Sequence, residues 1–367
     1  MKASLIRQMT CPECLGSLRC HRFAQAFDAI DAGVAWCEVC FSWYPIEGGI
    51  LELLPLKLAY LHDRQRFWEG HRQELEPLGL SEPVFDAIRA SDVEAERLQQ
   101  KHFDRFAKDE HQTYSEYERM PFWKCVDSRT FHAWRNQIVP GAWLLDIGCG
   151  QGRSTFNFMD QPIHIVGFDV SKSMIQEAVA RYRAKERAAE ATFFVGDASR
   201  LPFRDCVFEY VLTYGVLHHL PNPAGTAREI ARVLKPNGLY FGSENNETAL
   251  RSLFDALQRC IPLWREEAGR EPLISQEKLR QWFSGTPMAL ESRTHVFVPP
   301  HLVNLVGSRF GQALMRLSDR IGGWLPIMRD NGGLITFTGQ KLGEGQTGYP
   351  LVENRAAGES EGPGGAT

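Results

Sequence analysis

Short apolar runs recur along the second half of the chain and predict the strands of a sheet. They occupy residues 143–147, 163–168, 192–195, 210–212, 238–243, 292–298 and 334–341. Most of these runs are continuously apolar rather than alternating, which is the pattern of strands covered on both faces. The predicted class is therefore α/β, with a sheet whose strand ends form one edge.

Longer segments with helical character lie on either side of the first and last strands. Residues 57–135 are rich in charged and aromatic residues, contain few glycines and predict helices. Residues 299–333 carry apolar residues at helical spacing, with Arg309, Arg316, Arg320 and Arg329 beside them. The second segment fits either a helical cap over a substrate pocket, which is favoured, or an interfacial helix touching a membrane.

A glycine turn, Gly148-Cys-Gly150-Gln-Gly152, follows the first strand. Glycines remove Cβ atoms where the chain must turn sharply into a helix, so backbone N–H groups are left facing a ligand. The turn therefore points to a nucleotide-type cofactor. A dinucleotide fingerprint would have its third glycine at the position of Arg153, so NAD is disfavoured.

Polar or small residues end each of the next three strands. Asp169 stands about 20 positions beyond the glycines, the offset at which a carboxylate meets a ribose hydroxyl pair. Gly196-Asp197-Ala198 ends the third strand, and Thr213-Tyr214-Gly215 ends the fourth. Ligands of open α/β sheets bind in the crevice at these strand ends.

Four motifs in fixed order make residues 100–342 resemble the class I S-adenosylmethionine-dependent methyltransferases, especially the ubiquinone and menaquinone biosynthesis enzymes. They are Asp146-Ile-Gly148-Cys-Gly150-Gln-Gly152, Gly167-Phe-Asp169-Val-Ser171-x-x-Met174, Gly196-Asp197-Ala198-x-x-Leu201-Pro202-Phe203 and Arg228-Glu229-x-x-Arg232-Val-Leu-Lys-Pro-Asn-Gly238. The resemblance implies a Rossmann-like seven-stranded sheet whose seventh strand is antiparallel.

The resemblance also implies a role for each candidate residue. Gly148, Gly150 and Gly152 would admit the methionine moiety, and Asp146 would help to bind its ammonium group. Asp169 would take the ribose hydroxyls, and Asp197 with Ala198 and Met174 would contact the adenine. Thr213 and Tyr214 would line the sulfonium end. Strand-end capping is the alternative for Asp169 and Asp197.

Methyl transfer from a sulfonium needs mainly an acceptor held in line with the methyl group, so a general base is optional. His218 and His219 follow the fourth strand, where a base with near-neutral pKa can reach the acceptor. His218 is the candidate base. Packing or loop anchoring is an equally weighted alternative.

Four of the nine cysteines form two pairs near the start of the chain, Cys11-x-x-Cys14 and Cys37-x-x-Cys40. The 22 residues between the pairs match a four-cysteine structural zinc site, whose closed coordination leaves no open position for catalysis. Cys20 and His21 fall in the intervening strand. Redox chemistry is improbable for paired knuckles outside a βαβ unit.

The segment after the second knuckle, Trp43-Tyr-Pro-Ile-Glu-Gly-Gly-Ile50, makes residues 8–56 resemble the small zinc-ribbon proteins that activate methyltransferases. One glycine is extra relative to their signature. The resemblance implies a module fused in front of the enzyme, which stabilises it or holds a partner.

Composition bounds the remaining function classes. The chain has 367 residues, 43% of them hydrophobic, which suffices for a full core and an accessory domain. A net charge of −4 provides no broad basic field for nucleic acid. The chain has no apolar run of 18 residues and no signal-peptide core, so we expect a cytoplasmic protein, with membrane contact through residues 299–333 left open.

We therefore predict a zinc ribbon over residues 1–56, a helical linker or lid over 57–135, a methyltransferase domain over 136–342 with a cap at 299–333, and a disordered tail over 343–367. The expected cofactors are S-adenosylmethionine and structural zinc. The expected activity is O- or C-methylation of a small-molecule or lipid-linked acceptor. Alternatives are a ribosomal RNA guanine methyltransferase and a noncatalytic zinc-ribbon scaffold.

Overall fold

A computed structural model describes residues 1–23, 29–83, 94–108, 118–184, 188–248, 273–325 and 328–343. The predicted tail falls almost wholly outside these ranges, as do Tyr114, Tyr117 and residues 249–272 of the stretch after the fifth strand. Within them, no helix is both long and apolar enough to cross a membrane.

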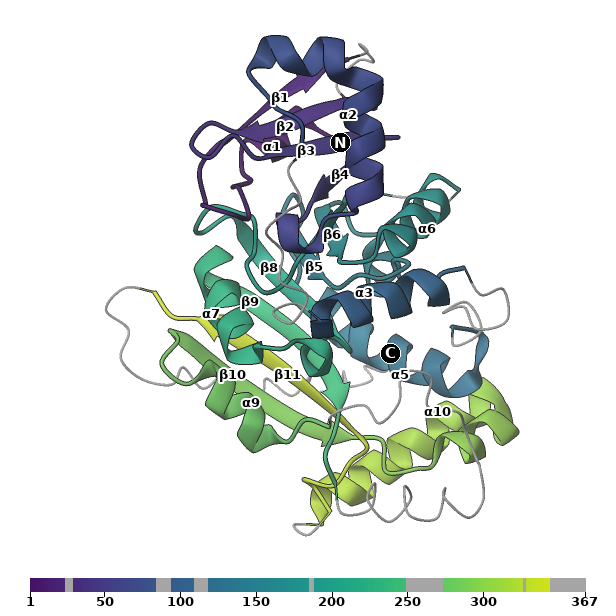
Figure 1. The fold of residues 1–367 in the computed structure, drawn as a ribbon. Helices are drawn as coiled ribbons and strands as arrows, with labels where there is room; N and C mark the ends of the chain where they lie inside the picture. The colour runs from purple at the N-terminus through teal and green to yellow at the C-terminus, as the bar shows by residue number, and fades with distance from the viewer. Residues whose placement is uncertain are drawn as a thin grey trace, which may run out of the picture.

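The predicted seven strands of the enzyme domain form one twisted sheet (Figure 1). In spatial order they are β7 (Glu190–Gly196), β6 (His164–Asp169), β5 (Trp143–Ile147), β8 (Phe208–Tyr214), β9 (Leu234–Asn245), β11 (Leu334–Lys341) and β10 (Met288–His295). β11 runs antiparallel to both neighbours and the other pairings from β7 to β9 are parallel. The class and the antiparallel last strand are as predicted.

The sheet does not end at β7, so the prediction of seven strands is wrong in number. Eleven strands join in the described residues, because β1 (Leu18–Arg22), β2 (Gly33–Cys37), β3 (Trp43–Glu47) and β4 (Ile50–Leu53) continue it. β4 pairs parallel with β7, with Glu52 opposite Val195 and Leu53 opposite Gly196. An edge strand leaves a row of unpaired N–H and C=O groups, and β4 satisfies that row on β7.

A buried ion pair connects the added strands to the next helix, α2 (Leu61–Leu75). The Arg64 guanidinium donates to Glu52 Oε1 over 3.1 Å and to the Leu54 carbonyl over 2.8 Å. Both side chains are less than 5% exposed. Lys172, at the start of α6 (Lys172–Arg183), places its ammonium 3.9 Å from Glu52. Residues of β4, α2 and α6 therefore meet at one buried carboxylate, that of Glu52.

Helices cover both faces of the sheet. The segment predicted to be helical contains α2, α3 (Glu94–Phe106) and α5 (Pro121–Arg135), while α7 (Pro223–Val233) and α9 (Gln276–Phe283) lie beside the later strands. A four-residue α1 (Ala3–Ile6) precedes the first strand of the ribbon. The predicted cap is α10 (Pro300–Trp324), which is broken at Gly307, where φ is +77°. It packs against α5 (Figure 1).

Candidate functional site

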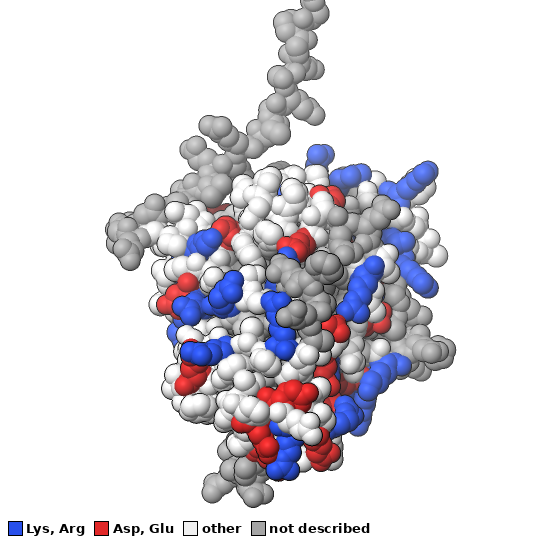
Figure 2. All heavy atoms as spheres, turned by 90° about the horizontal axis from the view of Figure 1, so that it is seen from above, with Lys and Arg blue, Asp and Glu red and all other residues white. Residues whose placement is uncertain are grey.

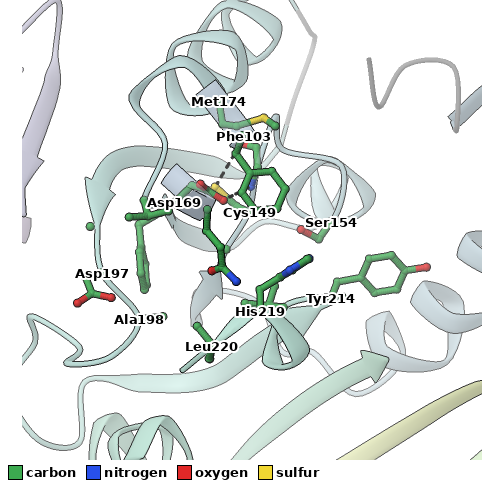
Figure 3. Close-up of a pocket in the computed structure, with 18 of the residues that line it drawn as sticks. Phe103, Cys149, Ser154, Asp169, Met174, Asp197, Ala198, Tyr214, His219 and Leu220 are labelled. Carbon is green, nitrogen blue, oxygen red and sulfur yellow. Dashed lines mark hydrogen bonds between the residues drawn. The ribbon is translucent and has the colours of Figure 1, made fainter. Parts of the chain in front are cut away.

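A pocket opens where β5, β6, β7 and β8 end, at the edge that the sequence predicted (Figure 3). Its wall comes from the glycine turn, from the ends of the next three strands, and from α3, which lies over them. The lining residues include Glu96, Gln99, Phe103, Gly148, Cys149, Gly150, Gln151, Arg153, Ser154, Asp169, Met174, Asp197, Ala198, Ser199, Tyr214, Val216, His219 and Leu220.

The glycine turn requires glycine for conformation and for space. Gly148, Gly150 and Gly152 all have positive φ, a region that other residues rarely adopt. A Cβ on Gly148 would lie 2.7 Å from a methyl of Val216, and one on Gly152 would lie 2.7 Å from the Phe156 ring. The turn therefore brings backbone, rather than side chains, to the pocket.

Asp169 ends β6 on the pocket wall and is tied to the turn. Its Oδ2 accepts from the Gly150 N–H over 3.1 Å, and its Oδ1 accepts from the Ser171 N–H over 2.9 Å. Burial raises the pKa of Asp169 to about 6. The carboxylate keeps further lone pairs for a ligand that donates, such as a pair of hydroxyl groups.

The adenine-side candidates lie on the same wall. Asp197 accepts from the Ser199 N–H over 3.0 Å, and burial raises the pKa of its carboxyl. Ala198 follows it, and Met174 lies in the first turn of α6, where the Ser171 side chain caps the helix. Asp169, Asp197 and Met174 therefore surround one part of the pocket (Figure 3).

Helix α3 supplies pocket residues that the sequence did not single out. Glu96, Gln99 and Phe103 lie on the wall. Asp104 anchors the helix, because it accepts from the Tyr60 hydroxyl over 2.8 Å and from the Ser171 hydroxyl over 2.6 Å. A lone acid beside aromatic residues gave no signal, since its partners are far away in the sequence.

Asp146 lies behind the turn and does not line the pocket. It is fully buried, and its Oδ2 accepts from the hydroxyls of Ser154 and Thr155 over 2.7 and 2.5 Å. Its Oδ1 has no hydrogen-bond partner in the described part of the chain. Burial raises the pKa of Asp146 to about 6. The structure thus uses one carboxylate oxygen of Asp146 to hold the turn and keeps the side chain off the pocket wall.

The structure separates Thr213 from Tyr214. Thr213 is fully buried and its hydroxyl lies 2.7 Å from the Tyr240 hydroxyl, away from the pocket. Tyr214 is on the wall, and its hydroxyl donates to Asp127 over 2.6 Å. Only Tyr214 of this pair can touch a ligand in the pocket.

Arg153 joins α5 to the same wall. Its guanidinium donates to both Asp127 oxygens, over 2.8 and 3.0 Å. It also lies over the rings of Trp123 and Tyr214, with centroid distances of 4.7 and 5.3 Å. Arg153 stands where a dinucleotide fingerprint would have its third glycine. In this structure it joins α5 to the glycine turn.

The two adjacent histidines differ in position. The His218 side chain is 4% exposed, its Nδ1 lies 2.6 Å from Glu244 Oε2, and it is not on the pocket wall. His219 is on the wall, edge-on to Phe103 at 5.3 Å. Burial and the neighbouring histidines lower the pKa of His219 to about 3. A neutral imidazole, not an imidazolium, faces the pocket.

Glu244 is a buried residue that sequence reasoning missed. Its Oε1 accepts from the N–H groups of Val216 and Leu217 over 2.9 and 2.7 Å. Together with the contact to His218, these bonds fix the loop that follows β8. His218 thus has the anchoring geometry that was its alternative prediction.

The four paired cysteines converge at the other end of the molecule. Their sulfur atoms all lie within 4.8 Å of one another, with 3.6 Å between Cys11 and Cys40 and 3.4 Å between Cys14 and Cys37. The N–H groups of Gly16 and Val39 each point at a sulfur over 3.4 Å. Cys20 and His21 lie in β1, as expected.

The first knuckle rests on the loop that carries Asp197. The Arg200 guanidinium donates to the Glu13 carbonyl over 2.9 Å, and the Thr10 N–H donates to the Pro202 carbonyl over 3.0 Å. The Arg204 N–H donates to the Gln8 carbonyl over 3.0 Å. The first knuckle therefore contacts the loop that continues from the pocket residues Asp197, Ala198 and Ser199.

Comparison with known proteins relates this geometry to a family. Residues 145–242 match the family described as methyltransferase domain. The chain is 33% identical over 103 residues to O-methyltransferase rstn1 of Aspergillus nomiae, covering 28% of this chain and 46% of that protein. It is 27% identical over 162 residues to demethylmenaquinone methyltransferase of Renibacterium salmoninarum, covering 41% and 66%.

Among solved structures, the YcgJ protein of Bacillus subtilis is 19% identical with a TM-score of 0.42, covering 59% of this chain and 99% of that one. The chain spans less than half the length of the first curated relatives that it matches. The family match covers the glycine turn, Asp169, Asp197 and the strands that present them. Residues 145–242 of the chain therefore match a methyltransferase domain.

Proposed function

We propose that the protein transfers the methyl group of S-adenosylmethionine to a small-molecule acceptor, by O- or C-methylation. The observation that carries the proposal is the single pocket wall on which the glycine turn, Asp169 and Asp197 meet within the methyltransferase domain. Several relatives named as O-methyltransferases and sterol C-methyltransferases support a small acceptor.

The pocket fits the cofactor in three respects. The turn has no side chain where Val216 and Phe156 leave no room for one, so backbone can approach the ligand. Asp169 can accept from the ribose hydroxyls, and Asp197 from the adenine amino group. Behind this wall, Asp146 holds the turn in place through its hydrogen bonds to Ser154 and Thr155.

When bound, the cofactor supplies an activated methyl group, so the protein's task is to orient and to desolvate. Phe103 on α3 and Val216 and Leu220 on the loop after β8 exclude water from the pocket. His219 can accept a hydrogen bond from an acceptor hydroxyl, because its imidazole is neutral. Its low pKa makes it an orienting group rather than a strong base.

A lipid-linked or otherwise apolar acceptor fits this wall best. Besides the two aspartates, the wall includes Phe103, Tyr214, Val216 and Leu220, which offer ring faces and methyl groups. One relative is named as a demethylmenaquinone methyltransferase and another as a sterol methyltransferase. Both names describe apolar acceptors.

We also propose that Cys11, Cys14, Cys37 and Cys40 hold a structural zinc ion. Zinc–sulfur bonds of about 2.3 Å in a tetrahedron place sulfurs about 3.8 Å apart. The two sulfur distances of 3.4 and 3.6 Å are near that value. The N–H groups that point at Cys14 and Cys37 would stabilise thiolates, and four sulfur ligands leave zinc no catalytic position.

Methylation of ribosomal RNA is the weaker alternative. Figure 2 shows Lys and Arg interspersed with Asp and Glu over the described residues of one face, rather than a single basic field. RNA binding would require clustered cations and would weaken steeply with salt. RNA binding that is strong at low salt and falls with salt would therefore support the alternative.

Calorimetric titration with S-adenosylmethionine and its demethylated product tests the proposal. We expect micromolar binding by the wild type, loss of at least about 30-fold in Asp169→Ala because two ribose hydrogen bonds are lost, and no change in the exposed control Asp205→Ala. Labelled methyl transfer to a panel of lipid extracts is then measured. Binding without transfer to any acceptor would favour the noncatalytic scaffold, and no binding would overturn both.

A further inference from the structure

The inward face of helix α10 packs against the rest of the molecule. Val303 and Met315 are buried against Phe122 and Val126 of α5. The Phe122 N–H donates to the Asn304 side chain over 2.9 Å. Asp319, the helix's one acidic residue, pairs with Arg129 over 2.6 Å. The position of α10 on the molecule is therefore set by its inward face alone.

The outward face of α10 is a continuous apolar row. Phe310 is 76% exposed and Trp324 is 83% exposed. Burial of an apolar side chain of this size is usually favourable by more than about 1 kcal/mol. The row comprises Leu302, Leu305, Val306, Phe310, Leu317, Ile321 and Trp324. Contiguous exposed apolar surface of this kind marks an interaction site in a soluble domain.

An arginine row runs beside the apolar row. Arg309, Arg316 and Arg320 are exposed and each directly precedes a residue of the apolar row, so the two rows lie about 100° apart around the helix. None of the three arginines forms an ion pair with a residue that the structure describes. The helix thus carries three solvated cations in a chain whose net charge is −4.

We propose that α10 binds in the plane of an anionic lipid bilayer. An interfacial helix inserts its apolar row to the depth of the acyl boundary and places adjacent arginines among anionic headgroups. The arginine row borders the apolar row on α10, and no described helix is suited to crossing the bilayer. The break at Gly307 divides the helix into two segments that follow one surface.

Charge complementarity favours a lipid surface over a second copy of the chain. Every charged residue on the outward face of α10 is an arginine. A two-fold interface through this face would bring the same patch from each copy, and therefore no carboxylate for the arginines. Lipid phosphates supply that charge along the whole length of the helix.

Vesicle flotation of the full-length protein tests the proposal, without using the cofactor. The vesicles are phosphatidylcholine alone or phosphatidylcholine with about one third phosphatidylglycerol. We expect the wild type to float with the anionic vesicles and binding to fall at high salt, because salt screens the arginines. Binding to phosphatidylcholine alone should be much weaker.

Two variants of the helix and two controls define the surface. Phe310→Ser with Trp324→Ser should bind anionic vesicles at least about tenfold more weakly, because interfacial affinity scales with inserted apolar area. Replacing Arg309, Arg316 and Arg320 by glutamine should reduce binding on the order of 100-fold, at roughly fivefold for each arginine. Val139→Ser, exposed and apolar elsewhere, and Arg228→Gln on α7 should bind as the wild type does.

Several outcomes would overturn the proposal. One is an absence of flotation with anionic vesicles at low salt. Another is flotation that neither helix variant reduces. A third is a dimer in sedimentation equilibrium that Phe310→Ser with Trp324→Ser dissociates, since that result would assign the apolar row to a second copy. Thermal melts of each variant, expected to match the wild type, exclude unfolding as the cause of lost binding.

Discussion

The two ends of the molecule attach additional structure to the same domain in opposite ways. At the β7 end, the ribbon continues the sheet, shares the buried Glu52–Arg64 pair and rests its first knuckle on the loop that carries Asp197. At the other end, α10 packs one face on α5 and leaves its other face exposed. The comparison indicates that the ribbon end maintains the pocket, whereas the α10 end is free to contact something outside.

The largest expected effect breaks the ribbon end. Cys37→Ser removes one of the four sulfur ligands of the proposed zinc ion, so the metal and the fold of the knuckles should be lost together. The loop carrying Asp197 then loses its support, and affinity for S-adenosylmethionine should fall more than about 100-fold. Metal analysis, circular dichroism and calorimetry measure the three losses. Cys206→Ser, outside the cluster, is the matched control.

Unchanged cofactor affinity in a Cys37→Ser protein that has lost its metal would contradict this expectation. It would show that the ribbon and the pocket are energetically independent despite their contacts.

A smaller effect comes from the ion pair between ribbon and helix. Glu52→Gln leaves Arg64 buried without its counterion, which costs about 3 kcal/mol. The melting temperature should fall by about 4 °C. Glu47→Gln, at the exposed end of β3, should leave it nearly unchanged. Equal melting temperatures for the two variants would mean that the pair does not join the ribbon to the domain.

The pocket lies between the two ends of the molecule, and the pH dependence of cofactor binding tests it. Burial raises the pKa of both Asp146 and Asp169 to about 6, and the carboxylate form of Asp169, on the pocket wall, is the acceptor. Affinity should therefore fall about fourfold from pH 7.5 to 5.5. Calorimetry at constant metal content measures it, and a flat profile would indicate that the Asp169 carboxylate does not touch the ligand.

The same two groups act on unliganded stability with the opposite sign. Their folded-state pKa values exceed the unfolded value of about 3.9, so the folded protein binds more protons between pH 4 and 6. Their contribution to the free energy of unfolding therefore increases as pH falls through about 6, while cofactor affinity decreases.

The smallest effect on stability is expected at the α10 end. Phe310→Ser and Trp324→Ser alter side chains that are more than 75% exposed, so the melting temperature should stay within about 1 °C of the wild type. Thermal melts in the absence of lipid measure this. A loss of several degrees would show that residues of this chain cover the apolar row.

Local patterns predicted the strands well because the apolar run that marks a buried strand lies within the strand's own residues. β11 has the predicted bounds, and β5 and β6 differ from prediction by at most one residue. β9 begins at Leu234 rather than residue 238, because its first residues pair with β8 across an irregularity. The glycine turn and the two strand-end aspartates also came from local spacing.

Pairing and pocket lining were less accessible because they depend on residues far apart in sequence. Nothing in Ile50–Leu53 specifies β7 as its neighbour. The pocket wall contains His219 rather than His218. A short 3₁₀ turn, Leu217–His219, directs the His218 ring toward Glu244 instead. Only the folded positions of Glu244 and Asp104 reveal what they hold.

The pairing of β4 with β7 has a consequence for the order of events during synthesis. β4 leaves the ribosome roughly 140 residues before β7, which at 5–20 residues per second is on the order of ten seconds. During that interval the ribbon presents an apolar edge strand with no partner, which is the kind of surface that recruits chaperones or aggregates. Binding of metal by the four cysteines would allow the ribbon to fold before β7 is synthesised. The yield of soluble protein is therefore expected to depend on the supply of zinc during translation.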